Sequence, residues 1–152
     1  MTKATLRQKD LDEDPNLLWN AFIDLVAFDE YEPLSEVQQW AHYCFTYDGQ
    51  IQNGGHLIFF ENYGLDYALK VLVSLENLAL SDNLEILRKA YQRAGTMQWV
   101  HKAGVEEYVQ VALTEPFRED DDAFYNLEPD ILNRLQDYAA RHMDQFFEVT
   151  TS

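Results

Sequence analysis

Residues 66–80 have apolar side chains on nearly every side of the helix that their spacing predicts. Surface helices of globular proteins are apolar along one stripe only, whereas a helix that is apolar all round is typical of the buried centre of a bundle. The side chains concerned are Leu69, Val71, Leu72, Val73, Leu75 and Leu78. We therefore expect a central buried helix here, with other helices packed around it.

The rest of the sequence supplies the surrounding helices. Only 4 prolines and 6 glycines occur in 152 residues, which favours long helices with short connections over a turn-rich β-sandwich. Ser35 and Gln38 have the spacing of a capping box. Apolar stripes predict further helices that begin near Pro15, Ser35, Leu57, Ser81, Gly104 and Pro129. We expect an all-α, single-domain multi-helix bundle: residues 1–13 form a polar, extended N-terminal arm and residues 14–148 an acidic helical domain, whose last helix ends near Phe147.

Asn53-Gly54-Gly55 interrupts this pattern of helices. An Asn-Gly pair often forms the turn of a β-hairpin, and residues 50–52 would then be one arm. Such arms would be very short, and the flanking segments have helical spacing, so we favour a break between two helices. The hairpin remains the alternative.

The charge of the chain limits its partners. There are 27 acidic residues against 11 basic ones, a formal net charge of -16. Such a field repels nucleic acids and anionic membranes and attracts basic partners over a Debye length of roughly 8 Å at physiological salt. An acidic surface also keeps proteins soluble, and this plainer explanation stays open.

The expected cellular compartment follows from the absence of disulfide, signal-peptide and membrane-span patterns in the sequence. Cys44 is the single cysteine, so an intrachain disulfide cannot form, and we expect Cys44 to pack as a small hydrophobe. The N-terminal residues have no apolar stretch of the signal-peptide type. No apolar run approaches the ~18–20 residues of a membrane-spanning helix. We expect a soluble cytoplasmic protein.

Catalytic and metal-binding patterns are missing from the sequence. The histidines occur singly, and there is no HExxH, CxxC or GxSxG motif. Asp120 and Asp122 have the spacing that begins a calcium loop, but the required glycine is absent, which favours a solvated charge run. We expect no metal, no cofactor and no enzymatic activity. An unrecognised hydrolase is the least favoured alternative.

Two groups of carboxylates are candidates for binding a basic partner. One lies near the junction of two predicted helices, and the other on a predicted loop over residues 115–122. We call them together the acidic surface. Its members are Asp29, Glu30, Glu32, Glu36, Glu115, Glu119, Asp120, Asp121 and Asp122.

The segment from Asn53 to Asn62, NGGHLIFFEN, resembles the NGG-x-x-x-F-F-x-N signature of the DMP-type DNA-mimic protein family. Residues 124–128 and the helix that follows are also similar to that family. The resemblance covers roughly residues 35–147. This chain departs from the pattern at His56, where the family usually has an aromatic residue, and at Ile58, where it often has glutamine.

We expect the motif residues to be structural. Gly54 and Gly55 would allow a positive φ or a close approach. Phe59 and Phe60 would pack in the core, and Asn62, which ends the motif that Asn53 begins, would cap backbone groups.

The resemblance implies a helical, often dimeric protein that regulates transcription. Its acidic surface would imitate the phosphates of double-stranded DNA and occupy the DNA-binding face of a transcription factor or another DNA-binding protein. The alternative is an acidic adaptor or immunity-type inhibitor that binds one basic partner without mimicry. Neither function requires direct contact with nucleic acid or a membrane.

Overall fold

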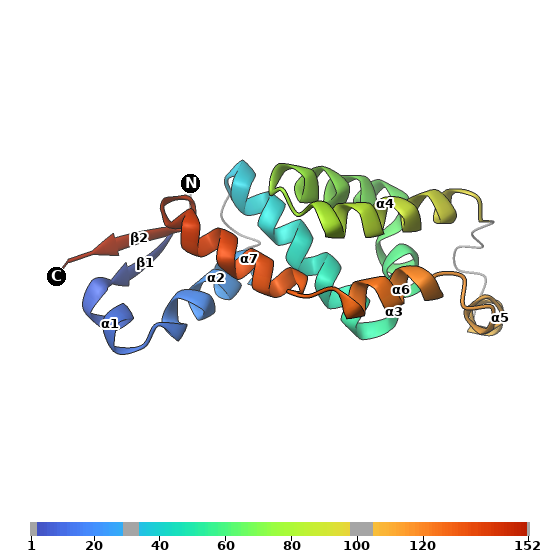
Figure 1. Cartoon of the computed structure of the whole chain (residues 1–152), viewed down its shortest axis with the longest axis horizontal. Helices are drawn as coiled ribbons and strands as arrows, with labels where there is room; N and C mark the ends of the chain where they lie inside the picture. Colours follow the sequence, from blue (N-terminus) through green and yellow to red (C-terminus); the bar gives the residue numbers. More distant parts are fainter. Residues whose placement is uncertain (1–2, 29–33, 98–104, 152) are drawn as a thin grey trace.

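The computed structural model describes residues 3–28, 34–97 and 105–151, and helices make up most of them. Seven α-helices lie in these described ranges, with one 3₁₀ helix and two short strands. In chain order the elements are β1 (Ala4–Arg7), α1 (Gln8–Glu13), α2 (Asn16–Phe28), α3 (Glu36–Asn77), α4 (Ser81–Gly95), α5 (Val105–Leu113), α6 (Arg118–Asn126), α7 (Ile131–Arg141), the 3₁₀ helix η1 (Met143–Gln145) and β2 (Phe147–Thr150). The multi-helix bundle is confirmed (Figure 1).

Helix α3 is the element that α2, α4, α6 and α7 all contact. It begins with the predicted capping box: the Ser35 hydroxyl accepts a hydrogen bond from the Gln38 backbone N–H at 3.2 Å, and the Gln38 side chain accepts one from the Ser35 N–H at 3.1 Å. The helix is interrupted at Gly54–Gly55 and again at Gly64, where the backbone leaves helical φ and ψ values. Residues 50–52 are helical, so the β-hairpin alternative is wrong.

The segment over residues 66–80 is buried on one side only. Val71, Leu75 and Leu78 are in the core, as expected, because α4 turns back after residues 78–80 and runs beside this part of α3 (Figure 1). Leu69 and Val73 are 45% and 52% exposed, which contradicts the expectation of burial all round. These two side chains line an open groove together with Trp40 and Tyr43 from the first part of α3.

The two ends of the chain differ from the prediction. Residues 8–13 form a helix rather than part of an extended arm, whereas residues 4–7 are extended and form β1, which pairs in parallel with β2. The last helix ends at Arg141 rather than near Phe147. The physical reason lies in Phe146 and Phe147, which are both buried: Phe146 packs edge-on against Phe22 at 5.2 Å, and burying two consecutive side chains turns the chain out of the helix.

The core is rich in aromatic side chains around α3, among them Phe22, Tyr47, Phe59, Phe60, Phe117, Phe124 and Phe146. Cys44 is fully buried as predicted, and the loss of solvation raises the pKa of its thiol well above the ordinary value. Within the described ranges, every helix is too short or too polar to cross a membrane.

Candidate protein-binding surface

The break in α3 at Gly54–Gly55 is a sharp corner that requires glycine. Gly55 has φ 77° and ψ −173°, a region that is open essentially to glycine alone. A Cβ atom at Gly55 would also lie 2.5 Å from Oδ2 of Asp121. The predicted positive φ is confirmed at Gly55 and the predicted close approach at both glycines, since a Cβ atom at Gly54 would lie 2.7 Å from Cγ2 of Ile58.

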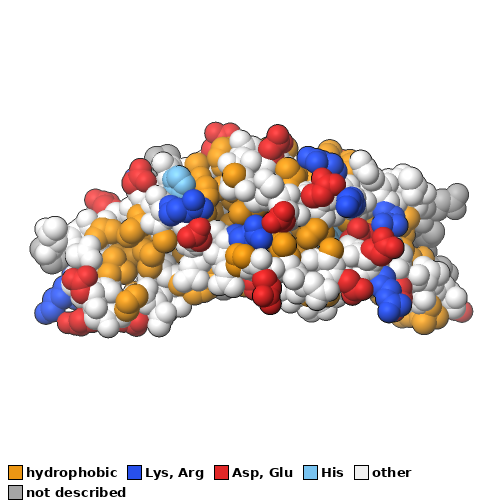
Figure 2. All heavy atoms as spheres, in the orientation of Figure 1, with side chains coloured by type: hydrophobic (Ala, Val, Ile, Leu, Met, Phe, Trp, Pro, Cys, Tyr) orange, Lys and Arg blue, Asp and Glu red, His pale blue; other side chains and the backbone are white. Residues whose placement is uncertain are grey.

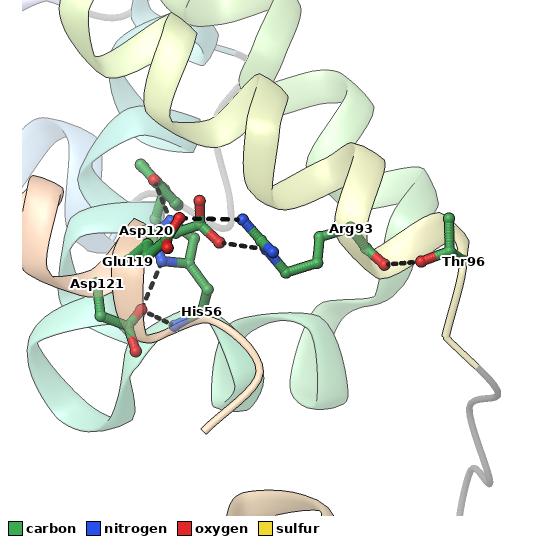
Figure 3. Close-up of polar contacts among 7 residues, drawn as sticks. His56, Arg93, Thr96, Glu119, Asp120 and Asp121 are labelled. Atoms are coloured by element: carbon green, nitrogen blue, oxygen red, sulfur yellow. Dashed lines mark hydrogen bonds and ion pairs between the residues drawn. The ribbon is translucent and has the colours of Figure 1, made fainter. Parts of the chain in front are cut away.

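His56 follows the corner and is held by Asp121 of α6. One carboxylate oxygen, Oδ1 of Asp121, accepts a hydrogen bond from the His56 backbone N–H at 2.8 Å and lies 2.6 Å from Nδ1 of the same residue (Figure 3). The imidazole is completely buried. The corner thus places a backbone N–H and a ring nitrogen side by side, facing one carboxylate.

Tyr47 completes this network from the first part of α3. Its hydroxyl oxygen lies 2.7 Å from Nε2 of His56. Burial, together with the negative charges of Asp121 and Asp120, raises the pKa of Tyr47 well above 10, so the phenol keeps its proton. Nδ1 donates to the Asp121 carboxylate, and Nε2 pairs with the Tyr47 hydroxyl. Both ring nitrogens therefore have a hydrogen-bond partner although the ring is buried.

Asp120 makes a second connection from α6. Its side chain is only 4% exposed, and Oδ2 accepts a hydrogen bond from Nε of Arg93 at 3.1 Å. Arg93 lies in the last turn of α4, and its guanidinium also approaches Glu119 at 3.8 Å (Figure 3). Asp120 and Asp121 therefore attach α6 to α4 and α3.

This arrangement corrects the prediction of a solvated acidic loop over residues 115–122. Residues 118–126 form α6, and Phe117 and Phe124 are both buried. Positions 117, 120, 121 and 124 have the i, i+3, i+4, i+7 spacing of one helix face. Asp120 and Asp121 consequently face the protein, where they form hydrogen bonds; Asp120 is buried, and Asp121 remains partly exposed.

The other members of the predicted acidic surface do not form a single group. Glu115, Glu119 and Asp122 are exposed around α6, and Glu36 is exposed at the start of α3. Residues 36–53 separate Glu36 from the corner that α6 covers, a length of about 27 Å in an α-helix. Asp29, Glu30 and Glu32 lie outside the described residues.

The phenylalanines of the NGG motif pack as predicted, whereas Asn62 does not. Phe59 and Phe60 are buried, and Phe60 packs on Phe117 at 5.3 Å between ring centres. The Asn62 amide donates to the side chain of Gln50 at 2.9 Å, so it links the two sides of the corner instead of capping the backbone. Asn53 is exposed.

The corner, its aromatic packing and the part of α6 that covers it all lie within one family match. A family model described as DMP19-like protein matches residues 32–142. The chain belongs to the DMP19-like protein family. Searches of the curated proteins and of the solved structures found no match.

The DMP19-like segment leaves out the two ends of the chain. It includes α3 with its corner and α4 to α7, whereas β1, α1 and α2 precede it and η1 and β2 follow it. The match to the family model confirms the resemblance that the NGG motif indicated.

Beside the corner, the DMP19-like segment has a pocket of about 370 Å³ between α3, α5 and α6. The lining includes Leu57, Tyr108, Asp121, Asp122 and Tyr125. The Tyr125 hydroxyl donates to the Ile51 carbonyl at 2.5 Å, which fixes its ring at the edge of the pocket. The pocket combines aromatic side chains with carboxylates, a lining suited to a cationic group.

Sequence reasoning missed His56, Arg93 and Asp48 as members of this region. His56 and Asp121 are 65 residues apart, and no local pattern joins them. Asp48 is buried on α3, where the loss of solvation raises its pKa to about 6. The spacing of Phe117 and Phe124 was the signal that could have revealed which carboxylates of α6 face inward. Within the described ranges, no group of three His, Cys, Asp or Glu side chains is placed to hold a metal ion.

Proposed function

We propose that this protein is an acidic protein-binding module that mimics double-stranded DNA and occupies the DNA-binding surface of a transcription factor or another DNA-binding protein. Membership in the DMP19-like family supports the proposal. The proposal includes a cytoplasmic location, a role in transcription regulation, a homodimer, and the absence of catalysis.

The observation that carries the proposal is the way the chain uses its arginines. Every arginine lies in the described part of the chain, and each one pairs with a carboxylate of the same chain. With 27 acidic and 11 basic residues, the excess is negative. Glu36, Asp66 and Asp122 are exposed and have no ion pair with another described residue. The guanidinium groups are thus engaged internally, while free carboxylates remain for a partner.

A DNA-binding protein is the kind of partner that this charge suits. Duplex DNA carries about one negative charge per 1.7 Å of its axis, and proteins bind it through lysine and arginine. Carboxylates on helices hold negative charge in fixed positions, as the phosphates of a duplex do. The same charge disfavours direct binding to DNA.

The adaptor alternative has one observation in its favour. Figure 2 shows a face on which lysine and arginine side chains are interspersed with the acidic ones, with apolar side chains between them. A DNA-like surface needs rows of negative charge, whereas an adaptor or immunity-type inhibitor needs only one acidic patch. Among the described residues, this face shows no continuous row of negative charge, which mimicry would need and the adaptor function would not.

Competition with DNA distinguishes the two functions. A DNA-binding protein that the immobilised chain retains would be purified, and duplex DNA would be titrated into the complex. We expect DNA to displace the chain, and we expect the chain alone not to shift duplex DNA in an electrophoretic assay. If DNA saturates the partner without displacing the chain, mimicry is wrong and the adaptor function takes its place.

A charge variant provides the control. Glu119→Gln combined with Asp122→Asn removes two exposed charges and should weaken association mainly through the on-rate. Asp120 and Asp121 are left intact because they hold α6 in place. The salt dependence should be shallower than the slope of about -0.9 per phosphate contact of B-DNA, since carboxylates release no condensed counterions.

A further inference from the structure

Helix α5 lies at one end of the molecule, beyond α6 (Figure 1). Five of its six apolar residues follow the i, i+3, i+4, i+7, i+8 spacing of one helix face, and the sixth is Val111. The five are Val105, Tyr108, Val109, Ala112 and Leu113. On a helix that packs against its own protein, such a stripe is normally covered along its whole width.

Among the described residues, one edge of this stripe packs against the protein and the other does not. Tyr108 and Ala112, with Val111 next to them, are partly buried against the core. Val105, Val109 and Leu113 are 81%, 43% and 72% exposed, although they are large aliphatic side chains at i, i+4 and i+8. We call these three the α5 edge. Adjacent apolar side chains exposed in this way mark interaction sites.

The covered edge of the same stripe borders the pocket beside the glycine corner. Tyr108 and Ala112 line that pocket together with Asp121, Asp122 and Tyr125. Asp121 uses Oδ1 for both hydrogen bonds to His56, so the carboxylate is held in a fixed orientation (Figure 3). Among the described residues, its Oδ2 has no hydrogen-bond partner, and the side chain is 26% exposed.

The charge around the α5 edge indicates what covers it. Glu106, Glu115 and Asp122 are exposed on or next to α5. Arg118 is the one base among the described residues that line the pocket, and it pairs with Glu115 at 3.3 Å. A second copy of this chain would bring another acidic rim against this one, which like-charge repulsion opposes. A basic partner would meet complementary charge.

We propose that the α5 edge and the adjoining pocket form the docking site for a segment of a basic protein that presents aliphatic side chains next to an arginine or lysine. The aliphatic side chains cover the α5 edge. The cationic side chain enters the pocket, where the carboxylates of Asp121 and Asp122 and the rings of Tyr108 and Tyr125 surround it. The inference rests on the proposed protein-binding function and locates the site of binding.

Two synthetic peptides test this site. One is an amphipathic peptide of arginine and leucine, and the other has serine in place of each leucine, so both carry the same charge. We expect the full-length protein to bind the leucine peptide at least about tenfold more tightly at physiological salt, because burial of one aliphatic side chain is worth about that factor. Isothermal titration calorimetry measures both affinities.

Matched variants assign the preference to α5. Val109→Ser combined with Leu113→Ser should remove the preference for leucine. Leu69→Ser combined with Val73→Ser changes the same residue types at exposed positions of α3 and should leave it intact. Thermal unfolding checks that each variant is folded. If the α5 variant still prefers the leucine peptide, the inference is wrong.

Two further results separate this inference from its alternatives. Light scattering that shows the α5 variant splitting a dimer would identify the α5 edge as a contact between copies and overturn the inference. Competition by duplex DNA tests mimicry alone. If DNA displaces the chain from its partner but the α5 variant binds that partner normally, mimicry is supported and the docking site is wrong. If DNA does not displace the chain but the α5 variant binds the partner poorly, the docking site is supported and mimicry is wrong.

Discussion

Glycine-to-alanine substitutions in α3 separate backbone strain from crowding at the corner. Gly55 and Gly64 have nearly the same backbone conformation, with φ 77° and ψ −173° against φ 81° and ψ 176°. A Cβ atom at Gly55 would lie 2.5 Å from Oδ2 of Asp121, whereas one at Gly64 has nothing within 4 Å. The two positions therefore share the strain and differ only in the neighbour.

The expected costs follow from this difference. Gly64→Ala should lower the free energy of unfolding by about 1–3 kcal/mol, the range for a residue forced into such a conformation. Gly55→Ala has the same strain and also displaces the carboxylate that binds His56. A hydrogen bond to a charged group contributes about 1.5–3 kcal/mol, so Gly55→Ala should cost at least about 1.5 kcal/mol more than Gly64→Ala. Gly49→Ala, at a helical and open position, should instead stabilise by about 0.5–1 kcal/mol.

Urea unfolding of these variants measures the differences, provided that the m-value stays constant. The contact with Asp121 is tested by adding Asp121→Ala, which removes the carboxylate. In that background the cost of Gly55→Ala should fall to that of Gly64→Ala. If Gly55→Ala is too unstable to measure alone, the Gly49→Ala background raises its stability. Equal costs for Gly55→Ala and Gly64→Ala in the otherwise unaltered chain would refute the argument.

The remaining predictions concern charged and buried groups. Asp120→Asn should lower the free energy of unfolding by about 3 kcal/mol or less, because it weakens a buried, charge-assisted hydrogen bond. Asp122→Asn should change the free energy of unfolding by less than about 0.5 kcal/mol. Equal effects in urea unfolding would contradict the inward orientation of Asp120. Tyr47→Phe should cost about 1–3 kcal/mol because it leaves Nε2 of His56 buried without a hydrogen-bond partner, and an unchanged midpoint would count against the network. Burial raises the pKa of Asp48 to about 6, above its unfolded value of about 3.9, so its contribution to stability is greatest below pH 4 and declines as pH rises to about 6. Asp48→Asn should therefore raise the free energy of unfolding at pH 7 by up to about 3 kcal/mol and by little at pH 4, and a gain that is the same at both pH values would be inconsistent with the raised pKa.

The sequence predicted those features of the fold that depend on neighbouring residues. Ser35 and Gln38 are close in the chain, so their spacing predicts a capping box, and the structure contains both of its hydrogen bonds. The NGG motif likewise indicated a break in the helix and a positive φ, which Gly55 has. In each case, the residues that determine the geometry lie within one or two helical turns.

Features that depend on distant residues were not predictable in the same way. The carboxylates of α6 were interpreted as a solvated run because hydrophilic residues are usually exposed, and their true orientation depends on Arg93 and on His56, which are remote in sequence. Only the buried pair Phe117 and Phe124 carried a local hint of which side faces inward. The exposed state of Leu69 and Val73 also depends on which helices pack nearby, and periodicity alone does not contain that information.

The pairing of β1 with β2 determines how the molecule can be attached to a surface. Ala4 lies opposite Phe147 and Arg7 opposite Thr150, so affinity tags fused before β1 and after β2 would emerge roughly 10 Å from each other. Both attachment points are at the opposite end of the molecule from α5 (Figure 1). Immobilisation through either tag would therefore present α5 and its pocket to the solution. A sensor prepared with each tag in turn should give the same affinity for a partner that docks on α5.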